Sequence, residues 1–388
     1  MTKIKLLSVF GTRPEAIKMA PLILELESRE EFASRVAVTG QHREMLQQVL
    51  KEFNLTPDYD LDIMRESQTL FDTTTGVLRG LENVLAQEKP HMLLVHGDTT
   101  TTFASALAAF YRQIPVGHVE AGLRSFSRYL PFPEEINRCL TTVLADLHFA
   151  PTETSRENLL QEGIDPQKII VTGNTAIDAL LMTVKKDHVF TDPSLQELDL
   201  SQKRVIVVEA HRRENWGAPL TEICTALGSL VRRRQDIRVI FPVHPNPIVR
   251  KTVYKELGGE VRVHLVPPLN YKDFVNLMAR AYLLVTDSGG IQEEAPSLGK
   301  PVLVLREVTE RPEAVAAGTV KVIGTAAKAV EAALNELLTD TEAYKNMARA
   351  VNPYGDGRAA CRIVDGLCSY FKLTREKSGE FGEFGDFE

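Results

Sequence analysis

Short apolar runs alternate with amphipathic stretches over most of the chain. Runs typical of buried parallel strands cover residues 4–10, 36–39, 92–95, 116–119, 146–151 and 169–172, and then 204–208, 238–243, 261–266, 281–286 and 301–305. Strands that alternate with helices form parallel sheets. The pattern therefore predicts an α/β protein built from two successive strand–helix halves.

The second half ends in helices rather than strands. Helices are expected over residues 326–338 and 342–348, and a last one over 358–371 follows a Pro- and Gly-containing break. Because a helix after such a break can return to the first half, we predict an N-terminal domain of residues 1–172 plus 358–377. Residues 173–357 form the C-terminal domain, with 187–201 as an exposed connection. The acidic, glycine-rich residues 378–388 are expected to be disordered.

Composition narrows the function classes. The 388 residues carry a formal net charge of −7, which gives no general attraction to nucleic acid or to an anionic membrane. No apolar window has the length of a membrane span, and the N-terminal apolar run is too short for a signal peptide. The four cysteines show no paired metal spacing and fit a reduced cytoplasmic setting best.

The unit of residues 281–313 carries the first signal for a ligand. An apolar strand runs into the turn Asp287-Ser288-Gly289-Gly290 and then into a short helix. Free backbone N–H groups at such a turn suit phosphate, Ser288 can add a hydroxyl donor, and Glu294 could hold ribose hydroxyls. Arg311 places a cation near the same strand ends. The sequence thus indicates a nucleotide diphosphate site, although an ordinary strand–turn–helix corner has the same pattern.

Charged residues also follow several strands of the first half. Arg13 and Lys18 lie at the turn after the first strand, where open α/β sheets bind ligands, although surface cations are common everywhere. Three acids, Asp98, Glu120 and Glu134, follow further strands or begin an adjoining helix. Asp98 alone could cap a helix, but three acids on one rim indicate acid–base chemistry.

Several motifs that would indicate other chemistry are not found. No G-x-G-x-x-G follows the first strand, so the sequence predicts no nicotinamide cofactor. Pro301 occupies the position where a P-loop needs Ser or Thr, and no cluster has zinc spacing, so no metal is expected. Acids together with phosphate-binding groups fit chemistry on a nucleotide sugar whose diphosphate is the leaving group.

The order of these motifs resembles the non-hydrolysing UDP-N-acetylglucosamine 2-epimerases from about residue 4 to 371. The segments that carry the resemblance are GTRPEAIKMAP, GDTTTT, HVEAGLR, PEEINR, APTETSRENLL, TGNTAIDAL, HRRENWG, VHPNP, TDSGGIQEEAPSLGKPVL, TERPEA and NPYGDG. The resemblance implies two Rossmann-like domains with a central cleft, a glycosyltransferase-B-like fold, and a homodimer. It also implies interconversion of UDP-GlcNAc and UDP-ManNAc without cofactor or metal, in the service of cell-surface polysaccharide biosynthesis.

The resemblance also implies roles for individual residues. The catalytic group would be Asp98, Glu120, Glu134 and His211. UDP would be bound by Arg13, Lys18, Ser288, Gly289, Glu294 and Arg311, and Arg138 would orient the acids. Which acid is the base stays open. A 2-epimerase for a modified sugar, such as UDP-2,3-diacetamido-glucuronic acid, would use the same motifs, and a glycosyltransferase of this fold is a further alternative.

Regulation is a last expectation from the resemblance. In bacterial relatives a second UDP-GlcNAc activates the enzyme, and Gln41, Arg212 and His244 match positions implicated there. Glu44 and Ser67 do not match, since a glutamine and, in some relatives, an arginine stand at these positions. Gaining an anion and losing a cation disfavours a second diphosphate, so we expect weak or absent activation, unless these positions vary freely.

Overall fold

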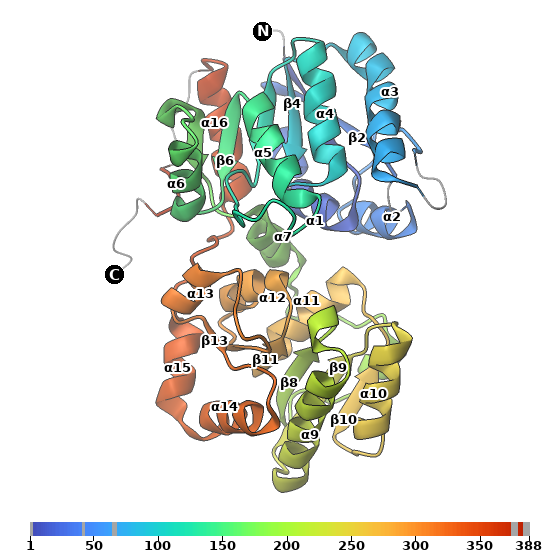
Figure 1. The fold of residues 1–388 in the computed structure, drawn as a ribbon, viewed down its shortest axis with the longest axis vertical. Coiled ribbons are helices and arrows are strands. Elements are labelled where there is room, and N and C mark those ends of the chain that lie inside the picture. The colour runs from blue at the N-terminus through green and yellow to red at the C-terminus, as the bar shows by residue number, and fades with distance from the viewer. Residues whose placement is uncertain (1–2, 41–42, 64–67, 374–378, 383–388) are drawn as a thin grey trace. The chain divides into compact units, whose positions relative to one another are not determined.

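The computed structural model describes residues 3–40, 43–63, 68–373 and 379–382. The chain divides into two units, unit 1 with residues 1–182 and 354–388, and unit 2 with residues 183–353. Each unit is a parallel sheet with helices on both sides (Figure 1), as the apolar pattern predicts. Among the described residues, no helix combines the length and the apolar character that a membrane crossing requires.

The sheet of unit 1 has seven strands within the described residues, all parallel. Their order is β3 (Tyr59–Asp60), β2 (Phe32–Val38), β1 (Ile4–Phe10), β4 (Met92–His96), β5 (Val116–Val119), β6 (Leu147–Ala150) and β7 (Ile169–Val171). The order changes direction between β1 and β4. In doubly wound sheets, ligands bind outside the strand ends at such a switch point.

The helices of unit 1 form two layers. They are α1 (Arg13–Glu27), α2 (Arg43–Glu52), α3 (Leu70–Glu88), α4 (Thr100–Tyr111), α5 (Glu134–Leu144), α6 (Glu153–Gln161), the 3₁₀ turn η1 (Pro166–Lys168), α7 (Thr175–Thr183) and α16 (Ala359–Tyr370). Helix α1 packs with α2 and α16, whereas α4 packs with α3 and α5. The two layers bury both faces of the sheet, which is why its strands are continuous apolar runs.

Unit 2 repeats the architecture with six strands within the described residues. Their order is β10 (Val263–Val266), β9 (Ile237–Pro242), β8 (Arg204–Glu209), β11 (Leu283–Thr286), β12 (Val302–Val304) and β13 (Val320–Val322). The helical segments are α8 (Pro193–Gln196), η2 (Arg213–Asn215), α9 (Ala218–Arg233), α10 (Pro247–Leu257), α11 (Tyr271–Arg280), α12 (Gly289–Glu294), η3 (Ala295–Leu298), α13 (Pro312–Ala316), α14 (Ala327–Thr339) and α15 (Thr341–Arg349). Here the switch point lies between β8 and β11.

The junction lies later in the chain than the sequence indicated, at 182/183 rather than 172/173, and the return begins at Tyr354 rather than Arg358. The reason is a buried carboxylate. Asp178 on α7 accepts the backbone N–H groups of Ala359 (3.2 Å) and Ala360 (2.8 Å), the first residues of α16. Since α16 has no side-chain cap of its own, this contact fastens both α7 and the returning helix to unit 1.

Four residues of the segment expected to be disordered, 379–382, are described, and they contact β7 and α16. Phe381 donates its backbone N–H to the Val171 carbonyl (3.0 Å), and Arg362 lies over the Phe381 ring. Arg362 also donates to the Gly379 carbonyl (3.1 Å). The expectation of disorder therefore does not hold for residues 379–382, because a buried arginine and the end of β7 bind them.

Candidate functional site

The acids of unit 1 gather where β4 and β5 end. Asp98 follows β4, and Glu120 follows β5. Because parallel strands end at the same edge, both side chains lie on one rim, together with Lys18 from α1. The sequence predicted this grouping from the strand ends alone.

Glu120 is held by two side chains, Lys18 and Asn174, and lies near a third, His96. Its Oε2 forms an ion pair with Lys18, accepts from Asn174 Nδ2 (2.9 Å) and lies 3.8 Å from His96 Nε2. Burial lowers the pKa of His96 to about 4, so this imidazole is neutral. The Glu120 backbone has a φ of 63°, a left-handed conformation that costs energy for a non-glycine residue. Strain and contacts together fix the direction of this carboxylate.

Asp98 is paired with Arg138 from α5. Burial raises the pKa of Asp98, the nearby Glu120 raises it further, and Arg138 opposes both effects. The alternative role as a helix cap is wrong, because Thr99 is the N-cap of α4 and accepts from Thr102 N. The Asp98 side chain therefore does not cap α4 and instead forms an ion pair with Arg138.

Glu134 and Arg13 lie apart from these pairs. Glu134 is the first residue of α5, and its buried Oε2 has no hydrogen-bond partner within the described part of the chain. Arg13 begins α1 and is half-buried. Neither forms an ion pair with the other predicted groups among the residues described. Neither side chain is therefore engaged in the pairs that hold Asp98 and Glu120.

A carboxylate that the sequence analysis did not select connects the two loops of this rim. Glu15, 3% exposed, accepts from the backbone N–H groups of Gly11 (3.1 Å) and Thr12 (2.7 Å). Its other oxygen accepts from the Thr99 hydroxyl (2.7 Å). Glu15 thus ties the turn that carries Arg13 to the turn that carries Asp98.

Two arginines lie beside the glycine turn of unit 2. A Cβ placed on Gly289 would lie 3.6 Å from an Arg311 nitrogen and 3.9 Å from an Arg212 nitrogen. Arg311 forms an ion pair with Glu293, and Arg212 lies 3.4 Å from Glu310. Both guanidinium groups therefore lie within van der Waals distance of the position that a Gly289 side chain would take. The predicted anion site and Arg212, expected at a separate regulatory position, are therefore one cluster.

The other residues predicted for this turn belong to α12. Ser288 is its N-cap residue but makes no side-chain cap hydrogen bond, and its backbone N–H donates to the Thr286 hydroxyl (3.0 Å). Glu294 is the last residue of α12. The Ser288 hydroxyl is thus not used to cap α12. The predicted role as a hydrogen-bond donor to a ligand requires this.

His211 follows β8 at the same edge of unit 2. Its Nδ1 lies 2.6 Å from Glu209 Oε1, and its ring stacks on His244 with the centroids 5.7 Å apart. The fully buried Asp287 accepts backbone N–H groups from His211 (3.0 Å) and Arg212 (3.0 Å) and so fixes this loop. His244, expected to be regulatory, therefore contacts the predicted catalytic histidine directly.

Some predictions stay outside these clusters. Gln41 lies outside the described residues. Among the described residues, the motifs did not point to several side chains that contact predicted groups or fix their loops, namely Glu15, His96, Asn174, Glu209, Glu293 and Asp287. Several of them also follow strands, so a search of strand ends for polar side chains of every kind would have found Asn174, Glu209 and Asp287.

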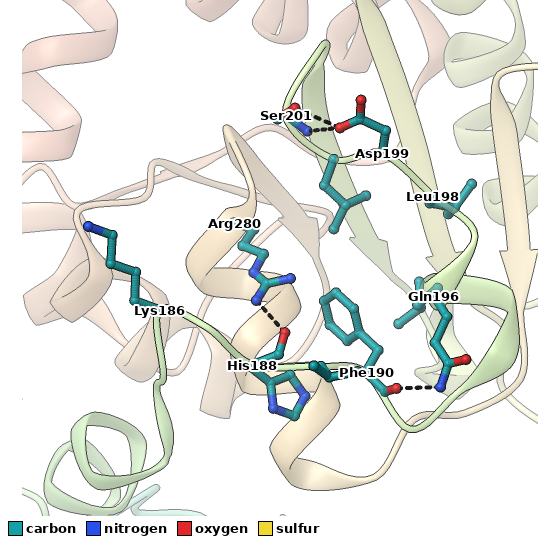
Figure 2. Close-up of a pocket in the computed structure, with 11 residues that line it drawn as sticks. Lys186, His188, Phe190, Gln196, Leu198, Asp199, Ser201 and Arg280 are labelled. Carbon is teal, nitrogen blue, oxygen red and sulfur yellow. Dashed lines mark hydrogen bonds between the residues drawn. The ribbon is translucent and has the colours of Figure 1, made fainter.

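A hollow of about 820 Å³ lies elsewhere in unit 2 (Figure 2). It is lined by the connection of residues 186–201 and by Arg280, which lies over the Phe190 ring and donates to the His188 carbonyl (2.6 Å). Ser201 precedes β8, so the hollow is at the amino end of a strand whose carboxyl end carries His211. None of the predicted site residues lines it.

Comparison with known proteins decides the family. The family model described as UDP-N-acetylglucosamine 2-epimerase matches residues 24–368. The chain belongs to this family. A relative named UDP-N-acetylglucosamine 2-epimerase from Bacillus subtilis is 52% identical over 381 residues, which cover 98% of this chain and 99% of the relative.

Solved structures agree with the family assignment. The crystal structure of the UDP-GlcNAc 2-epimerase from Neisseria meningitidis bound to UDP-GlcNAc is similar with a TM-score of 0.85 and 50% identity, covering 94% of this chain and 100% of that one. A glycotransferase of kitacinnamycin matches with a TM-score of 0.64 at 14% identity, covering 94% of this chain and 100% of that one. The latter supports the glycosyltransferase-B-like fold alone, which the sequence analysis predicted.

Proposed function

We propose that this protein interconverts UDP-N-acetylglucosamine and UDP-N-acetylmannosamine by eliminating UDP and adding it back. The C2 hydrogen of the sugar is not beside a carbonyl, so it is not acidic in the intact substrate. Breaking the C1–O bond to UDP gives C1 oxocarbenium character, and a base can then remove the C2 proton to leave a glycal. Proton delivery to the other face of C2 and return of UDP to C1 complete the epimerisation.

The roles follow from the charges that each step needs. Asp98, Glu120 and Glu134 exchange protons around C2, with Arg138 and Lys18 as counter-ions. In unit 2, Arg311, Arg212 and the turn at Ser288 and Gly289 stabilise the departing diphosphate, and Glu294 holds the ribose. Arg13 is a further cation at the rim of unit 1. His211 adds a donor beside the same turn. No step requires a metal or a nicotinamide.

One observation carries this proposal. Glu120 and Asp98 lie on one rim, each paired with its own cation, and Glu120 keeps a strained backbone. Two carboxylates with different surroundings are what a reaction with two opposite proton transfers requires. The family's named activity gives the substrate, and the alternative of a modified UDP-sugar finds no support in the relatives described above.

Heavy water provides the test. Purified protein is incubated with UDP-GlcNAc in D₂O, without added metal or acceptor, and the sugar is followed by proton NMR. We expect loss of the C2 proton signal and a mixture of the two epimers. Free N-acetylmannosamine with UDP would instead indicate a hydrolysing enzyme, and retention of the C2 proton would refute the proposal.

We further propose that the chain is a cytoplasmic homodimer. Among the described residues, the outer side of α4 and α5 exposes large apolar side chains, with Phe110, Tyr111 and Val143 at 58, 68 and 80%. A surface of this kind favours a protein partner. Sedimentation velocity should give twice the monomer mass, and Val143→Asp should lower the measured mass.

The free thiols Cys139, Cys224, Cys361 and Cys368 favour a reducing compartment such as the cytoplasm.

A further inference from the structure

We infer that Glu209 is a positioning residue for the reaction, because its carboxylate holds the His211 imidazole and balances its positive charge beside the anion cluster. This inference rests on the proposed function, in which His211 acts near the departing diphosphate. Glu209 is not among the residues that the motifs select. The three side chains that support the inference are Glu209, Thr286 and His211.

The carboxylate of Glu209 is hydrogen-bonded at one oxygen and lies beside the His211 ring at the other. Glu209 is the last residue of β8 and is paired in register with Thr286 on β11. The Thr286 hydroxyl donates to Glu209 Oε2 (3.0 Å), while Oε1 lies 2.6 Å from His211 Nδ1. Thr286 itself accepts the backbone N–H of Ser288 (3.0 Å). The turn with the anion cluster, the carboxylate and the imidazole therefore form one connected chain of contacts.

The charges around His211 come from several elements. Glu209 lies on β8, Asp287 Oδ1 is 3.4 Å from Nδ1, Arg212 is the next residue in the loop, and His244 stacks on the ring from the turn after β9. The Glu209 contact is the main cause that raises the pKa of His211 above its ordinary value, with Asp287 adding to it. Burial and Arg212 act in the opposite direction.

The contact has a chemical consequence for the ring. With Nδ1 beside Glu209, Nε2 is the nitrogen left to reach a ligand, and the ring carries a proton there whenever it is an imidazolium. A protonated His211 ring near Arg212 and Arg311 adds a charged donor for a phosphate oxygen, which gains negative charge as UDP leaves. The contact with Glu209 therefore orients the His211 ring and favours its protonated form.

The test replaces Glu209 with Gln, which keeps the shape and removes the charge. The ring signals of His211, assigned with His211→Asn, are titrated by NMR in each variant. We expect the His211 titration to move to lower pH in Glu209→Gln. We also expect kcat/KM for C2 exchange to fall by about 10-fold at alkaline pH, the low end for losing an orienting carboxylate. The alkaline limb of the pH profile should move the same way.

Two further variants separate charge from structure. Glu209→Asp keeps the carboxylate and should restore part of both effects. Glu214→Gln removes one negative charge from the same loop, where Glu214 pairs with Arg306 (2.8 Å), and should leave the His211 titration in place. Circular dichroism checks that each variant folds, and if Glu209→Gln does not fold, Glu209→Asp carries the comparison through a smaller shift in the same direction.

Other outcomes would overturn the inference. An unchanged His211 titration in Glu209→Gln refutes the pairing, whether or not the protein is an epimerase. A shifted titration with an unchanged pH profile refutes the role in the reaction. A carboxylate oxygen of Glu209, one of Asp287 and a ring nitrogen of His211 lie within 4.8 Å of one another. If EDTA abolished the activity, and Mn²⁺ restored it only in protein that keeps Glu209, the positioning role of Glu209 would also be refuted. If the unmodified protein shows no C2 exchange at all, the proposed function is refuted. The NMR titration would still test the contact between Glu209 and His211.

Discussion

Replacing Glu15 should separate the need for hydrogen-bond acceptors from the need for a charge. Its Oε2 accepts from two backbone N–H groups, of Gly11 (3.1 Å) and Thr12 (2.7 Å). Its Oε1 faces hydroxyls of Thr99 (2.7 Å) and Thr102 (3.1 Å). A glutamine can keep its oxygen toward the N–H pair and turn its NH₂ toward the hydroxyls, because hydroxyls also accept. An alanine can do neither.

The magnitudes differ enough to measure. Glu15→Ala leaves two N–H groups without an acceptor at about 1–3 kcal/mol each, for a total of about 2–6 kcal/mol, and the bond lost from Thr12 N–H is also the Glu15 half of the capping box of α1. Glu15→Gln loses only the charge assistance of these bonds, about 1 kcal/mol. Because Glu15 joins the turns of Arg13 and Asp98, the alanine variant should also slow C2 exchange by more than about 10-fold.

Native-state hydrogen exchange of the β1 amides reports the stability of unit 1, and the heavy-water assay reports activity. The exposed Glu27, at the end of the same helix, provides a control, and Glu27→Ala should change stability by less than about 0.5 kcal/mol. If Glu15→Gln is as damaging as Glu15→Ala, the charge and not the acceptors holds the loops. If Glu15→Ala costs less than about 1 kcal/mol, the reasoning about this contact is wrong.

Three further predictions concern the proposed reaction. Asp98→Asn, Glu120→Gln and Glu134→Gln should each lower turnover by at least about 10²-fold while UDP still binds in calorimetry, and a near-normal rate removes that residue from the catalytic group. Arg311→Ala should weaken UDP binding by about 10-fold or more, because a charge-assisted bond is lost, and unchanged affinity would show that this arginine points away from the ligand. Pure UDP-ManNAc should react promptly without UDP-GlcNAc, and a lag that a trace of UDP-GlcNAc abolishes would show that activation is retained.

The strands show which parts of the fold the sequence could predict. Runs such as residues 4–10 and 116–119 match β1 and β5 residue for residue, because strands buried on both faces are apolar at most of their positions. The strands β3 and β13 have two and three residues and lie at sheet edges, so they leave no apolar run to detect. The pattern therefore locates the central strands and the edge strands β7 and β10, and it misses the two short edge strands β3 and β13.

The candidate site was predictable at the level of residues but not of their partners. A parallel sheet puts all strand ends on one rim, so acids after β4 and β5 must be neighbours. Which side chains pair with one another depends on the order of the strands in the sheet. Thr286 contacts Glu209 because β11 lies beside β8, although the two strands are not consecutive in the chain. Lys18 was predicted to bind UDP, and in the structure its ammonium forms an ion pair with Glu120. This pairing depends on how α1 packs against the sheet, which the sequence pattern does not specify.

Asp178 shows how such a hidden contact becomes measurable. Burial raises the pKa of Asp178 to about 6, although two N–H groups from α16 favour the charged form. A carboxyl whose pKa is higher in the folded state than the ordinary 3.8 binds protons preferentially when folded, so stability is lost as pH rises from about 4 through 6. Relative to Asp178→Asn, which does not titrate, the unmodified protein should lose stability on the order of 3 kcal/mol over this range. Urea unfolding at several pH values measures the difference. A relative gain with rising pH would mean that the hydrogen bonds to Ala359 and Ala360 outweigh burial, and that this carboxylate fastens α16 as an anion.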